Sequence, residues 1–403
     1  MLHEKHIVLG VSGSIAAYKA ADLASKLRQA GALVDVILTP SATRFVTPLT
    51  FQSVTGRKAY TDADLWGGEG HVVHVGLAED ADLMLIAPCT ANTLAKLAHG
   101  QADTLLSLTA LAARCPLLVA PAMDGGMFAH PATQANVETL TARGVAVLGP
   151  ASGHLASGLR GVGRMLEPGE LIGHVRLTLG RNGVLSGRRV VVTAGPTQEP
   201  LDPVRFLSNR SSGRQGFALA QAAAEAGAQV TLIAGPVRLE TPVGVRRVDV
   251  HTAREMLAAV LAEIEQADLL LMAAAVADFR PAQTWEEKIK KGAAALQIPL
   301  AANPDILQEV AAFRGRRGFP RAVVGFAAES EALLENAQSK LARKRLDFIV
   351  ANDITQPDAG FKVATNRVTL LFPDGQVKRL PLMSKDEVAR HVVAQAAQIL
   401  EAQ

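Results

Sequence analysis

Aromatic side chains are scarce in this sequence, where they make up 4% of the 403 residues. Proteins that bind single-stranded nucleic acid stack the bases on aromatic side chains, so this scarcity argues against that class. The formal net charge of +3 is also small for a nucleic-acid surface. Together with a pI of about 8.9, it fits small anionic ligands better.

Cysteine is scarce as well, and Cys89 and Cys115 form no CxxC pair and have no histidine at metal-ligand spacing. This argues against a zinc site or a disulfide framework and favours a reducing compartment. Long apolar runs are missing too, since stretches such as 267–278 are shorter than the roughly 20 residues that span a bilayer. The first residues lack the pattern of a signal peptide. We expect a cytoplasmic protein without a membrane segment.

Strand-like and helix-like segments alternate along the chain. A length of 403 residues exceeds what one hydrophobic core usually supports, so two domains are expected. Continuous apolar strands that alternate with helices are typical of a parallel sheet covered on both faces. Because the pattern restarts after a polar, glycine-rich stretch, we expect two doubly wound α/β domains, 1–187 and 188–403. The expected strands are 6–11, 33–38, 81–88, 116–123, 144–150, 188–194, one within 226–236, 267–278, 322–328 and 347–353.

Two local signals lie near the end of the chain. Asp374-Gly375 stands between strand-like residues of 367–382 and is typical of a hairpin turn. Ser384 and Glu387 have the spacing of a capping box, which predicts the start of the last helix.

The segment GVSGSIAAYK, residues 10–19, follows the first expected strand and opens a helix. Backbone N–H groups and the helix dipole attract a phosphate at such a turn, and the hydroxyls of Ser12 and Ser14 can add hydrogen bonds. A dinucleotide site would need GxGxxG and an acidic residue after the second strand, and neither is present there. The segment is therefore a plain tight turn or a site for a mononucleotide such as FMN, and a nicotinamide oxidoreductase is disfavoured.

Two more polar stretches follow successive strands of the first half. Thr90 and Asn92 lie in APCTANT, and PAMDGGM occupies residues 121–127. Each alone fits ordinary loop chemistry, but two of them at successive strand ends favour one shared site. His71 and His74 have no such context, and their spacing alone is typical of surface histidines.

A nineteen-residue segment, 195–213, separates a strand from a helix in the second half. Such a turn needs only a few residues, and ligands bind at the carboxyl ends of strands in open α/β sheets. A functional loop is therefore favoured over a long surface loop. The absence of GxxxxGK[ST] excludes a P-loop enzyme.

These motifs together carry a resemblance. The first half contains Gly-x-Ser-Gly-Ser-Ile-Ala-Ala-Tyr-Lys, His74-x-x-Leu77, Ala-Pro-x-Thr-Ala-Asn-Thr and Pro-Ala-Met-x-x-x-Met with the spacing of the flavin-dependent cysteine decarboxylases. The whole chain resembles the bifunctional phosphopantothenoylcysteine decarboxylase / phosphopantothenate–cysteine ligases of coenzyme A biosynthesis. The resemblance implies a flavodoxin-like flavoprotein domain followed by a CTP-binding ligase domain, with FMN and Mg2+ as cofactors. It also implies a homo-oligomer with trimeric decarboxylase and dimeric ligase domains.

For the first half, the resemblance implies that FMN oxidises the thiol of 4'-phosphopantothenoylcysteine, so that CO2 can leave and 4'-phosphopantetheine is formed. His74 matches the family's active-site histidine, a base or polarising donor beside the thiol. The residues implied to bind FMN are Gly13, Ser14, Ile15, Thr39, Thr90, Asn92 and Met123.

Two residues depart from the family pattern. Asp124 stands where the family usually has an asparagine that binds the substrate carboxylate, and a second carboxylate repels the first unless it is protonated, turned away or neutralised. Ser157 stands where the family often has a cysteine that protonates the intermediate, and a hydroxyl is a far weaker acid. These departures leave a flavin-binding regulatory protein with an impaired decarboxylase half as the alternative.

For the second half, the resemblance implies that CTP and Mg2+ convert 4'-phosphopantothenate to an acyl-cytidylate, which the amine of cysteine attacks. Asn209 would stabilise that intermediate. Lys288 would stabilise phosphoryl charge, although a charge run such as EKIKK is usually a solvated surface. The residues implied to hold the phosphate and acyl group are Arg205, Arg210, Ser211, Ser212 and Gly213. Those implied to bind the nucleotide are Asp278, Lys288, Asn303, Pro304, Asp305, Ile306, Phe326, Lys340 and Lys344.

Overall fold

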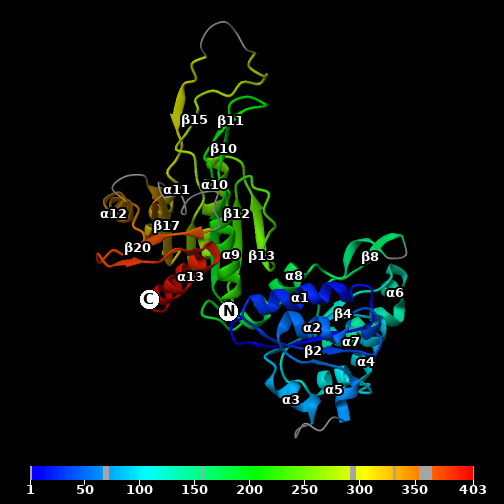
Figure 1. Ribbon diagram of the computed structural model, residues 1–403. Helices are drawn as coiled ribbons and strands as arrows, with labels where there is room; N and C mark the ends of the chain where they lie inside the picture. The colour runs from blue at the N-terminus through cyan, green and yellow to red at the C-terminus, as the bar shows by residue number, and fades with distance from the viewer. Residues whose placement is uncertain are drawn as a thin grey trace. The chain divides into compact units, whose positions relative to one another are not determined.

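The computed structural model describes residues 2–66, 72–155, 158–290, 296–329, 333–353 and 365–402. The chain divides into two compact units, residues 1–179 and 180–403. The boundary expected from the sequence, 187/188, lies slightly further along the chain. Each unit is built around its own sheet (Figure 1).

The first unit contains a six-stranded parallel sheet in the order β3-β2-β1-β4-β5-β6. Without the two-residue edge strand β3, this is the flavodoxin-like order, and it reverses between β1 and β4. The expected strand at 144–150 contributes two residues to the sheet. The strands are β1 (His6–Val11), β2 (Leu33–Leu38), β3 (Ala59–Tyr60), β4 (Leu83–Cys89), β5 (Leu117–Pro121) and β6 (Ala146–Val147).

Helices cover both faces of this sheet because alternate strand residues point to opposite sides. Leu9 and Leu85 pack in one core with Leu23 of the first helix, and Val8 and Met84 pack in the other. A hairpin of β7 (Ala151–His154) and β8 (Arg160–Arg164) follows the sheet. The helices are α1 (Ala17–Gln29), η1 (Ala42–Arg44), α2 (Pro48–Thr55), η2 (Asp62–Trp66), α3 (Val73–Asp80), α4 (Ala91–His99), α5 (Leu105–Ala112), α6 (Gly125–Ala129), α7 (Pro131–Ala142) and α8 (Pro168–Gly180).

The second unit contains an eight-stranded sheet in the order β13-β12-β9-β14-β17-β18-β20-β21. The first six strands in sequence are parallel and follow the 3-2-1-4-5-6 order of Rossmann folds, with the reversal between β9 and β14. The hairpin expected at Asp374-Gly375 is confirmed, because β20 and β21 pair antiparallel across it. The strands are β9 (Arg189–Ala194), β12 (Gln229–Ala234), β13 (Val245–Asp249), β14 (Leu269–Met272), β17 (Ala322–Glu329), β18 (Phe348–Asp353), β20 (Val368–Leu371) and β21 (Val377–Arg379).

Two helices of the second unit, α9 and α13, pack against each other (Figure 1). The capping box at the start of α13 is confirmed: the Glu387 N–H donates to Ser384 Oγ at 3.2 Å, and the Ser384 N–H donates to Glu387 Oε2 at 2.8 Å. The helices are α9 (Arg214–Glu225), α10 (Ala253–Glu263), η3 (Ile264–Gln266), α11 (Ile306–Arg317), α12 (Leu333–Arg343) and α13 (Lys385–Glu401). Residues Thr365–Asn366 (β19) pair with Met383–Ser384 (β22) just before α13.

Two small strand pairs extend from the second sheet (Figure 1). They are β10 (Gln198–Pro200) with β11 (Phe206–Ser208), and β15 (Phe279–Pro281) with β16 (Leu300–Ala302). The Trp285 N–H donates to the Leu201 carbonyl at 3.0 Å and joins the two pairs. We call residues 198–208 and 279–290 together with β16 the arm. More than half of the long 195–213 segment therefore folds into the arm.

None of the helices in these described ranges is long and apolar enough to cross a membrane.

Candidate functional site

A cavity of about 920 Å³ lies where the strand order of the first sheet reverses. Segments after β1, β2, β4 and β5 form its wall together with the β7–β8 hairpin. The volume is in the range of small-molecule sites. We call it the first cavity, and the predicted residues in its wall are Gly13, Ser14, Ile15, Thr39, Thr90, Asn92, Met123 and Asp124.

The start of α1 faces the first cavity. Ala16 is the N-cap residue and has no side chain that could cap the helix. The positive end of the α1 dipole therefore lies at the cavity wall, where it favours an anion. Gly13 precedes it, and a Cβ on Gly13 would lie 2.3 Å from the Cβ of Ser41. Glycine is therefore needed for the turn after β1 to approach the turn after β2.

A buried hydroxyl holds the next turn in place. Ser12 Oγ donates to the Pro88 carbonyl at 2.8 Å and accepts from the Thr90 N–H at 3.0 Å. Thr90 in turn caps α4 by accepting from the Thr93 N–H at 3.3 Å. The sequence offered Ser12 as a phosphate contact, but its hydroxyl is used to join two turns, and Ser12 does not line the cavity.

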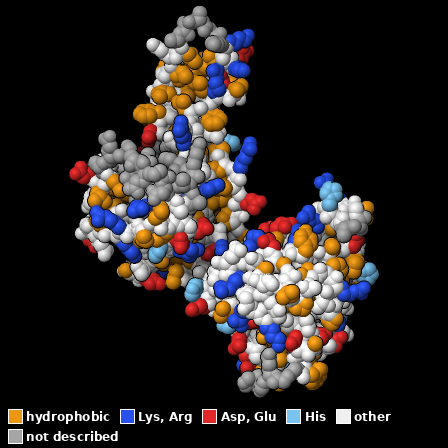
Figure 2. Space-filling model, viewed as in Figure 1, with side chains coloured by type: hydrophobic (Ala, Val, Ile, Leu, Met, Phe, Trp, Pro, Cys, Tyr) orange, Lys and Arg blue, Asp and Glu red, His pale blue; other side chains and the backbone are white. Residues whose placement is uncertain are grey.

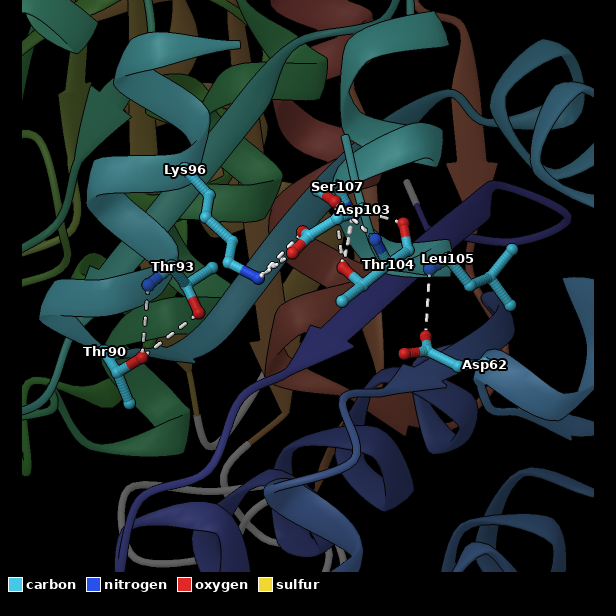
Figure 3. A network of polar contacts seen from close by, with 8 residues as sticks. All are labelled: Asp62, Thr90, Thr93, Lys96, Asp103, Thr104, Leu105 and Ser107. Carbon is cyan, nitrogen blue, oxygen red and sulfur yellow. Dashed lines mark hydrogen bonds and ion pairs between the residues drawn. The ribbon is translucent and has the colours of Figure 1, made fainter. Parts of the chain in front are cut away.

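Lys96, Thr104 and Ser107 also line the first cavity, and sequence reasoning missed them. Figure 3 shows their network: Lys96 Nζ contacts both carboxylate oxygens of Asp103 at 2.7 and 2.8 Å. This hydrogen bond lowers the pKa of the Asp103 carboxyl. Thr104 and Ser107 form the capping box of α5. Lys96 lies four residues after Asn92 on the same helix, and this spacing could have predicted that both face the same site.

The other basic residues of the first cavity also have acidic partners. Lys19 Nζ lies 2.6 Å from Glu167 Oε1, and Arg164 Nη2 lies 3.0 Å from the same oxygen. The hydrogen bond from Lys19 is the main cause that lowers the pKa of Glu167. Three basic residues and one acid, Asp124, line the described wall, and Asp103 and Glu167 beside it pair with the three basic residues. This suits a ligand with a largely neutral ring system and one phosphate.

Asp124 has a structural explanation for its charge. It is the N-cap residue of α6, and its Oδ1 accepts from the Gly126 N–H at 2.9 Å. A carboxylate is stabilised at a helix N-terminus by the free N–H groups and the dipole. The hydrogen bond therefore turns one carboxylate oxygen of Asp124 toward the start of α6.

Ser157 lies outside the described residues, between β7 and β8. His154 and Leu155 of that hairpin line the first cavity. Cys89 is buried, and burial raises the pKa of its thiol; Cys115 is half-buried with its thiol pKa raised for the same reason. Neither cysteine lines the cavity, so the described wall offers no thiol in place of the family's cysteine.

His74 does not lie in the wall of the first cavity. It stands in the first turn of α3, where its Nδ1 is buried and has no hydrogen-bond partner among the described atoms. Val72 and Val75 on either side are exposed. A single chain therefore does not place His74 in the wall with the residues predicted to bind FMN. His71 lies outside the described residues.

A second cavity of about 580 Å³ lies where the strand order of the second sheet reverses. We call it the second cavity. Its wall combines the start of α9, the segment after β14, the start of α11 and the end of α12. The predicted residues in this wall are Asn209, Arg210, Ser211, Ser212, Gly213, Asp278, Asn303, Pro304, Asp305, Ile306, Phe326, Lys340 and Lys344.

Hydrogen bonds fix the polar side chains of the second cavity. Asn209 Nδ2 donates to the carbonyls of Ala275 and Val276 at 3.3 and 3.0 Å. Asn303 Nδ2 donates to the Ala277 carbonyl at 2.9 Å. Gly213 is the N-cap residue of α9 at φ +75°, a left-handed conformation that favours glycine. Residues 273–278, which follow β14, belong to no helix or strand and form part of this wall.

Basic residues outnumber acidic ones in the described wall of the second cavity, five against two. Asp305 caps α11 and lies 3.2 Å from Lys344 Nζ. Sequence reasoning missed Arg214, Gln215, Asn352, Asn366 and Lys385, which come from four separate elements or loops. No group of three or more metal-ligating side chains occurs among the described residues. The charged wall residues are Arg210, Arg214, Lys340, Lys344, Lys385, Asp278 and Asp305.

Arg205 and Lys288 lie on the arm and not in the wall of the second cavity. Arg205 Nε donates to Asp202 at 3.0 Å, and its Nη2 donates to the Ile289 carbonyl at 2.9 Å. The Arg205 hydrogen bond holds the pKa of the buried Asp202 well below its usual range. Lys288 is exposed. One chain therefore does not bring these two residues to the other predicted site residues, because the segments that carry them fold into the arm.

Comparisons with known proteins cover both units. The Flavoprotein family model matches residues 1–179, and the model of the DNA/pantothenate metabolism flavoprotein C-terminal domain matches residues 185–400. The coenzyme A biosynthesis bifunctional protein CoaBC of Vibrio cholerae is 47% identical over 391 residues, which cover 96% of this chain and 97% of that protein. Its namesake in Escherichia coli K12 is 46% identical over 385 residues, covering 95% and 94%.

Two solved structures are also similar. The crystal structure of the C-terminal domain of a CoaBC protein is 38% identical with a TM-score of 0.47, and it covers 55% of this chain and 100% of that one. A phosphopantothenoylcysteine (PPC) decarboxylase mutant complexed with pantothenoylaminoethenethiol is 36% identical with a TM-score of 0.41, covering 43% and 98%.

Proposed function

The chain belongs to the family of bifunctional coenzyme A biosynthesis proteins, and we propose the roles of its two cavities from that premise. It is a bifunctional coenzyme A biosynthesis enzyme that combines a decarboxylase with a ligase, and its first half is a flavoprotein domain. Residues 1–187 would carry the decarboxylase and residues 188–403 the ligase. The observation that carries this assignment is one cavity at each switch point, each lined by most of the residues predicted for its reaction.

The first cavity is proposed to bind FMN, which supplies two-electron redox chemistry when bound. The N–H groups at the start of α1 and the hydroxyl of Ser14 would hold its phosphate. Thr39, Thr90 and Asn92 would hydrogen-bond the ribityl chain or the ring, and Met123 would pack against it. The fit is supported by the start of α1 in the wall, by the volume, and by the acids that pair with the basic residues of this wall.

Three residues would act on the substrate of the first cavity. His74 would polarise or accept the proton of the cysteinyl thiol. Asp124, held by the Gly126 N–H at the start of α6, would lie near the substrate carboxylate. Ser157 stands where the family has a proton-donating cysteine, so we expect the final protonation to be the slow step.

The second cavity is proposed to bind CTP and 4'-phosphopantothenate. Its excess of basic residues supports a ligand with several phosphates. Asn209 would stabilise the acyl-cytidylate, and Lys340 and Lys344 would face the triphosphate. Mg2+ would be held mainly by phosphate oxygens, with Asp278 as a protein ligand, because the described residues offer no cluster of acids.

A homo-oligomer would complete both sites. His74, Arg205 and Lys288 lie outside the cavity wall of their own chain, so a second copy is the natural source for them. Figure 2 shows apolar side chains gathered on the arm, where Phe206 and Phe279 are exposed. Such patches mark interfaces. The proposed assembly has trimeric decarboxylase domains and dimeric ligase domains, as the family resemblance implies.

We also propose a cytoplasmic location, because the chain has two cysteines and neither is paired in a disulfide.

Mass spectrometry of the products from 4'-phosphopantothenate, cysteine, CTP and Mg2+ tests the whole proposal. Formation of 4'-phosphopantetheine shows that both halves are active. If the reaction stops at 4'-phosphopantothenoylcysteine although the protein carries flavin, the alternative of a flavin-binding regulatory first half is correct. A product two hydrogens lighter than 4'-phosphopantetheine shows that decarboxylation occurs while Ser157 fails to support the final reduction.

A further inference from the structure

Glu167 joins two parts of the first unit that lie far apart in the sequence. Its Oε1 accepts hydrogen bonds from Lys19 Nζ at 2.6 Å and from Arg164 Nη2 at 3.0 Å. Lys19 belongs to α1 and Arg164 to β8, and both line the first cavity. Glu167 is not among the described residues of that wall. One carboxylate oxygen beside the cavity thus holds two cations of its wall.

The β7–β8 hairpin, which carries Arg164, packs against the turn after β5. The Met123 N–H donates to the Gly163 carbonyl at 3.0 Å. A Cβ on Gly163 would lie 2.2 Å from the Met123 carbonyl oxygen, and a Cβ on Gly125 would lie 3.2 Å from the carbonyl oxygen of Val162. Glycine at these two positions lets the backbones of the hairpin and the turn approach closely. The hairpin therefore has a defined seat at the cavity.

The side chain of Arg164 lies across the other strand of the hairpin. A Cβ on Gly153 of β7 would lie 2.6 Å from Arg164 Cδ and 2.8 Å from its Nη1. His154 and Leu155 directly follow Gly153, and both line the first cavity. The place where Arg164 is held therefore affects both strands of the hairpin and the wall residues that they carry.

Without the charge of Glu167, two cations would remain side by side. Lys19 and Arg164 reach the same oxygen, so their charged groups lie close together, and the Lys19 side chain is only 14% exposed. Partly buried charges are screened less than charges at the open surface. Because α1 packs in a core through Leu23, whereas a two-stranded hairpin is marginally stable by itself, we expect the repulsion to displace the hairpin.

An ordinary exposed ion pair lacks this arrangement. The Glu167 side chain is 56% exposed, and exposed pairs usually contribute little to stability. Asp22 and Lys26 form such a pair within α1, and neither residue belongs to the described wall of the first cavity. Glu167 differs because it connects two wall elements and separates two like charges.

We propose that Glu167 is a positioning residue of the first cavity, which acts through Arg164 to hold the β7–β8 hairpin against the turn at Met123. This role rests on the proposed decarboxylase function of the cavity. Glu167 would set where His154 and Leu155 lie relative to α1. Its loss should therefore impair decarboxylation while the flavin stays bound.

The test compares full-length E167Q, R164M and the double variant E167Q/R164M, with D22N as the control for an exposed ion pair on α1. Decarboxylation of supplied 4'-phosphopantothenoylcysteine and flavin absorbance are measured. E167Q and R164M should each lower kcat/KM about 10- to 100-fold, as expected for displaced groups in a site, at the flavin content of the wild type. The double variant should be no worse than R164M, because the two residues act as one unit. D22N should match the wild type.

Hydrogen exchange gives a second measurement, which does not depend on activity. The Met123 amide is bonded to the Gly163 carbonyl, so its exchange reports whether the hairpin is seated. Exchange at Met123 should be faster in E167Q than in the wild type or D22N. E167D keeps the charge on a side chain one methylene shorter and should recover part of both effects. If E167Q does not fold, E167D and E167D/R164M take its place.

Three results would overturn the proposed role. Losses that multiply in the double variant show that Glu167 and Arg164 act independently. Exchange of the Met123 amide at the wild-type rate in E167Q shows that the hairpin does not depend on Glu167. Loss of flavin from E167Q places the effect at α1 instead. If the wild type does not decarboxylate its substrate, the proposed decarboxylase function fails, and exchange at Met123 still decides whether Glu167 seats the hairpin.

Discussion

The two cavities occupy equivalent places in two related folds, yet the charged residues that line them differ in number and in their acidic partners. In the first cavity Lys19, Lys96 and Arg164 each contact an acid that lies outside the wall or at its edge. In the second cavity five basic residues face two acids. The same topology therefore provides one wall whose three basic residues pair with acids beside it, for a ring system with one phosphate, and one wall with five basic residues, for several phosphates. The fold decides where the ligand binds, and the charges that line the site decide which ligand it is.

The largest expected effect comes from removing the charge excess of the second cavity. The double variant K340M/K344M should lower kcat/KM for CTP roughly 1,000-fold, because two charge-assisted hydrogen bonds to phosphate are lost. Decarboxylation of supplied 4'-phosphopantothenoylcysteine should stay at the wild-type rate. K378M, in which an exposed lysine of β21 is replaced, is the control. A loss under tenfold in the double variant would contradict a basic wall built for a triphosphate.

The next largest effects are expected from two variants of the first unit, one at Gly13 in the cavity wall and one at His74, which lies outside that wall. G13V should carry little flavin, because its Cβ would lie 2.3 Å from that of Ser41 and the two turns would separate. H74N should bind flavin normally but lose decarboxylation by about 100-fold. G76A is a control for G13V, since no atom lies within 4 Å of a Cβ at Gly76. Flavin absorbance and 4'-phosphopantetheine formation are the two measurements.

Mixing these two variants tests whether the site is shared between copies. Co-expressed G13V and H74N chains should form 4'-phosphopantetheine well above either variant alone, because His74 of one copy would serve the flavin of another. Activity that stays at the level of the single variants would place His74 and the first cavity in the same chain.

A smaller effect is expected where a cation is already paired. K96M removes the partner of Asp103, which is largely exposed, so the remaining carboxylate stays hydrated. Flavin affinity should fall only a few-fold, and the thermal midpoint should change little, because exposed ion pairs contribute little to stability. A loss as large as that expected for K340M/K344M would show that Lys96 contributes as much to its site as the two lysines of the second cavity do to theirs.

The smallest effect is the pH dependence of the Glu167 pair. Lys19 lowers the pKa of Glu167 in the folded state, so the ion pair stabilises the protein above the unfolded pKa of about 4.3. This contribution is lost as the pH falls through the folded value. The difference in thermal midpoint between wild type and E167Q should be constant from pH 7 to about 5 and shrink below pH 4. If the difference in thermal midpoint instead grows as the pH falls, the pKa of Glu167 is not lowered in the folded protein.

Much of the fold and of the second site followed from the sequence. Apolar strands, the Asp374-Gly375 turn and the Ser384–Glu387 cap are local patterns, and local patterns survive in the folded chain. Thr90 and Asn92 were noticed because they follow a strand. The 209–213 run lies in the long segment after a strand, and the family resemblance gave its residues their roles. Lys96 was missed because it lies one turn inside α4, and Lys385 was missed because it begins α13, far along the chain. Neither lysine directly follows an expected strand of the sheet that carries its cavity.

By itself, the sequence determined the two doubly wound units, the order of their strand-end motifs and the family, because these depend on short-range periodicity and on residue spacing. Only the tertiary structure decided which predicted residues meet. It joined Asn209, Asp278 and Lys340 around one cavity, carried Arg205 and Lys288 away on the arm, and kept His74 out of the wall of its own chain. The physical reason is that such contacts depend on how segments far apart in the chain pack, and on the exit angles of loops that no local pattern encodes.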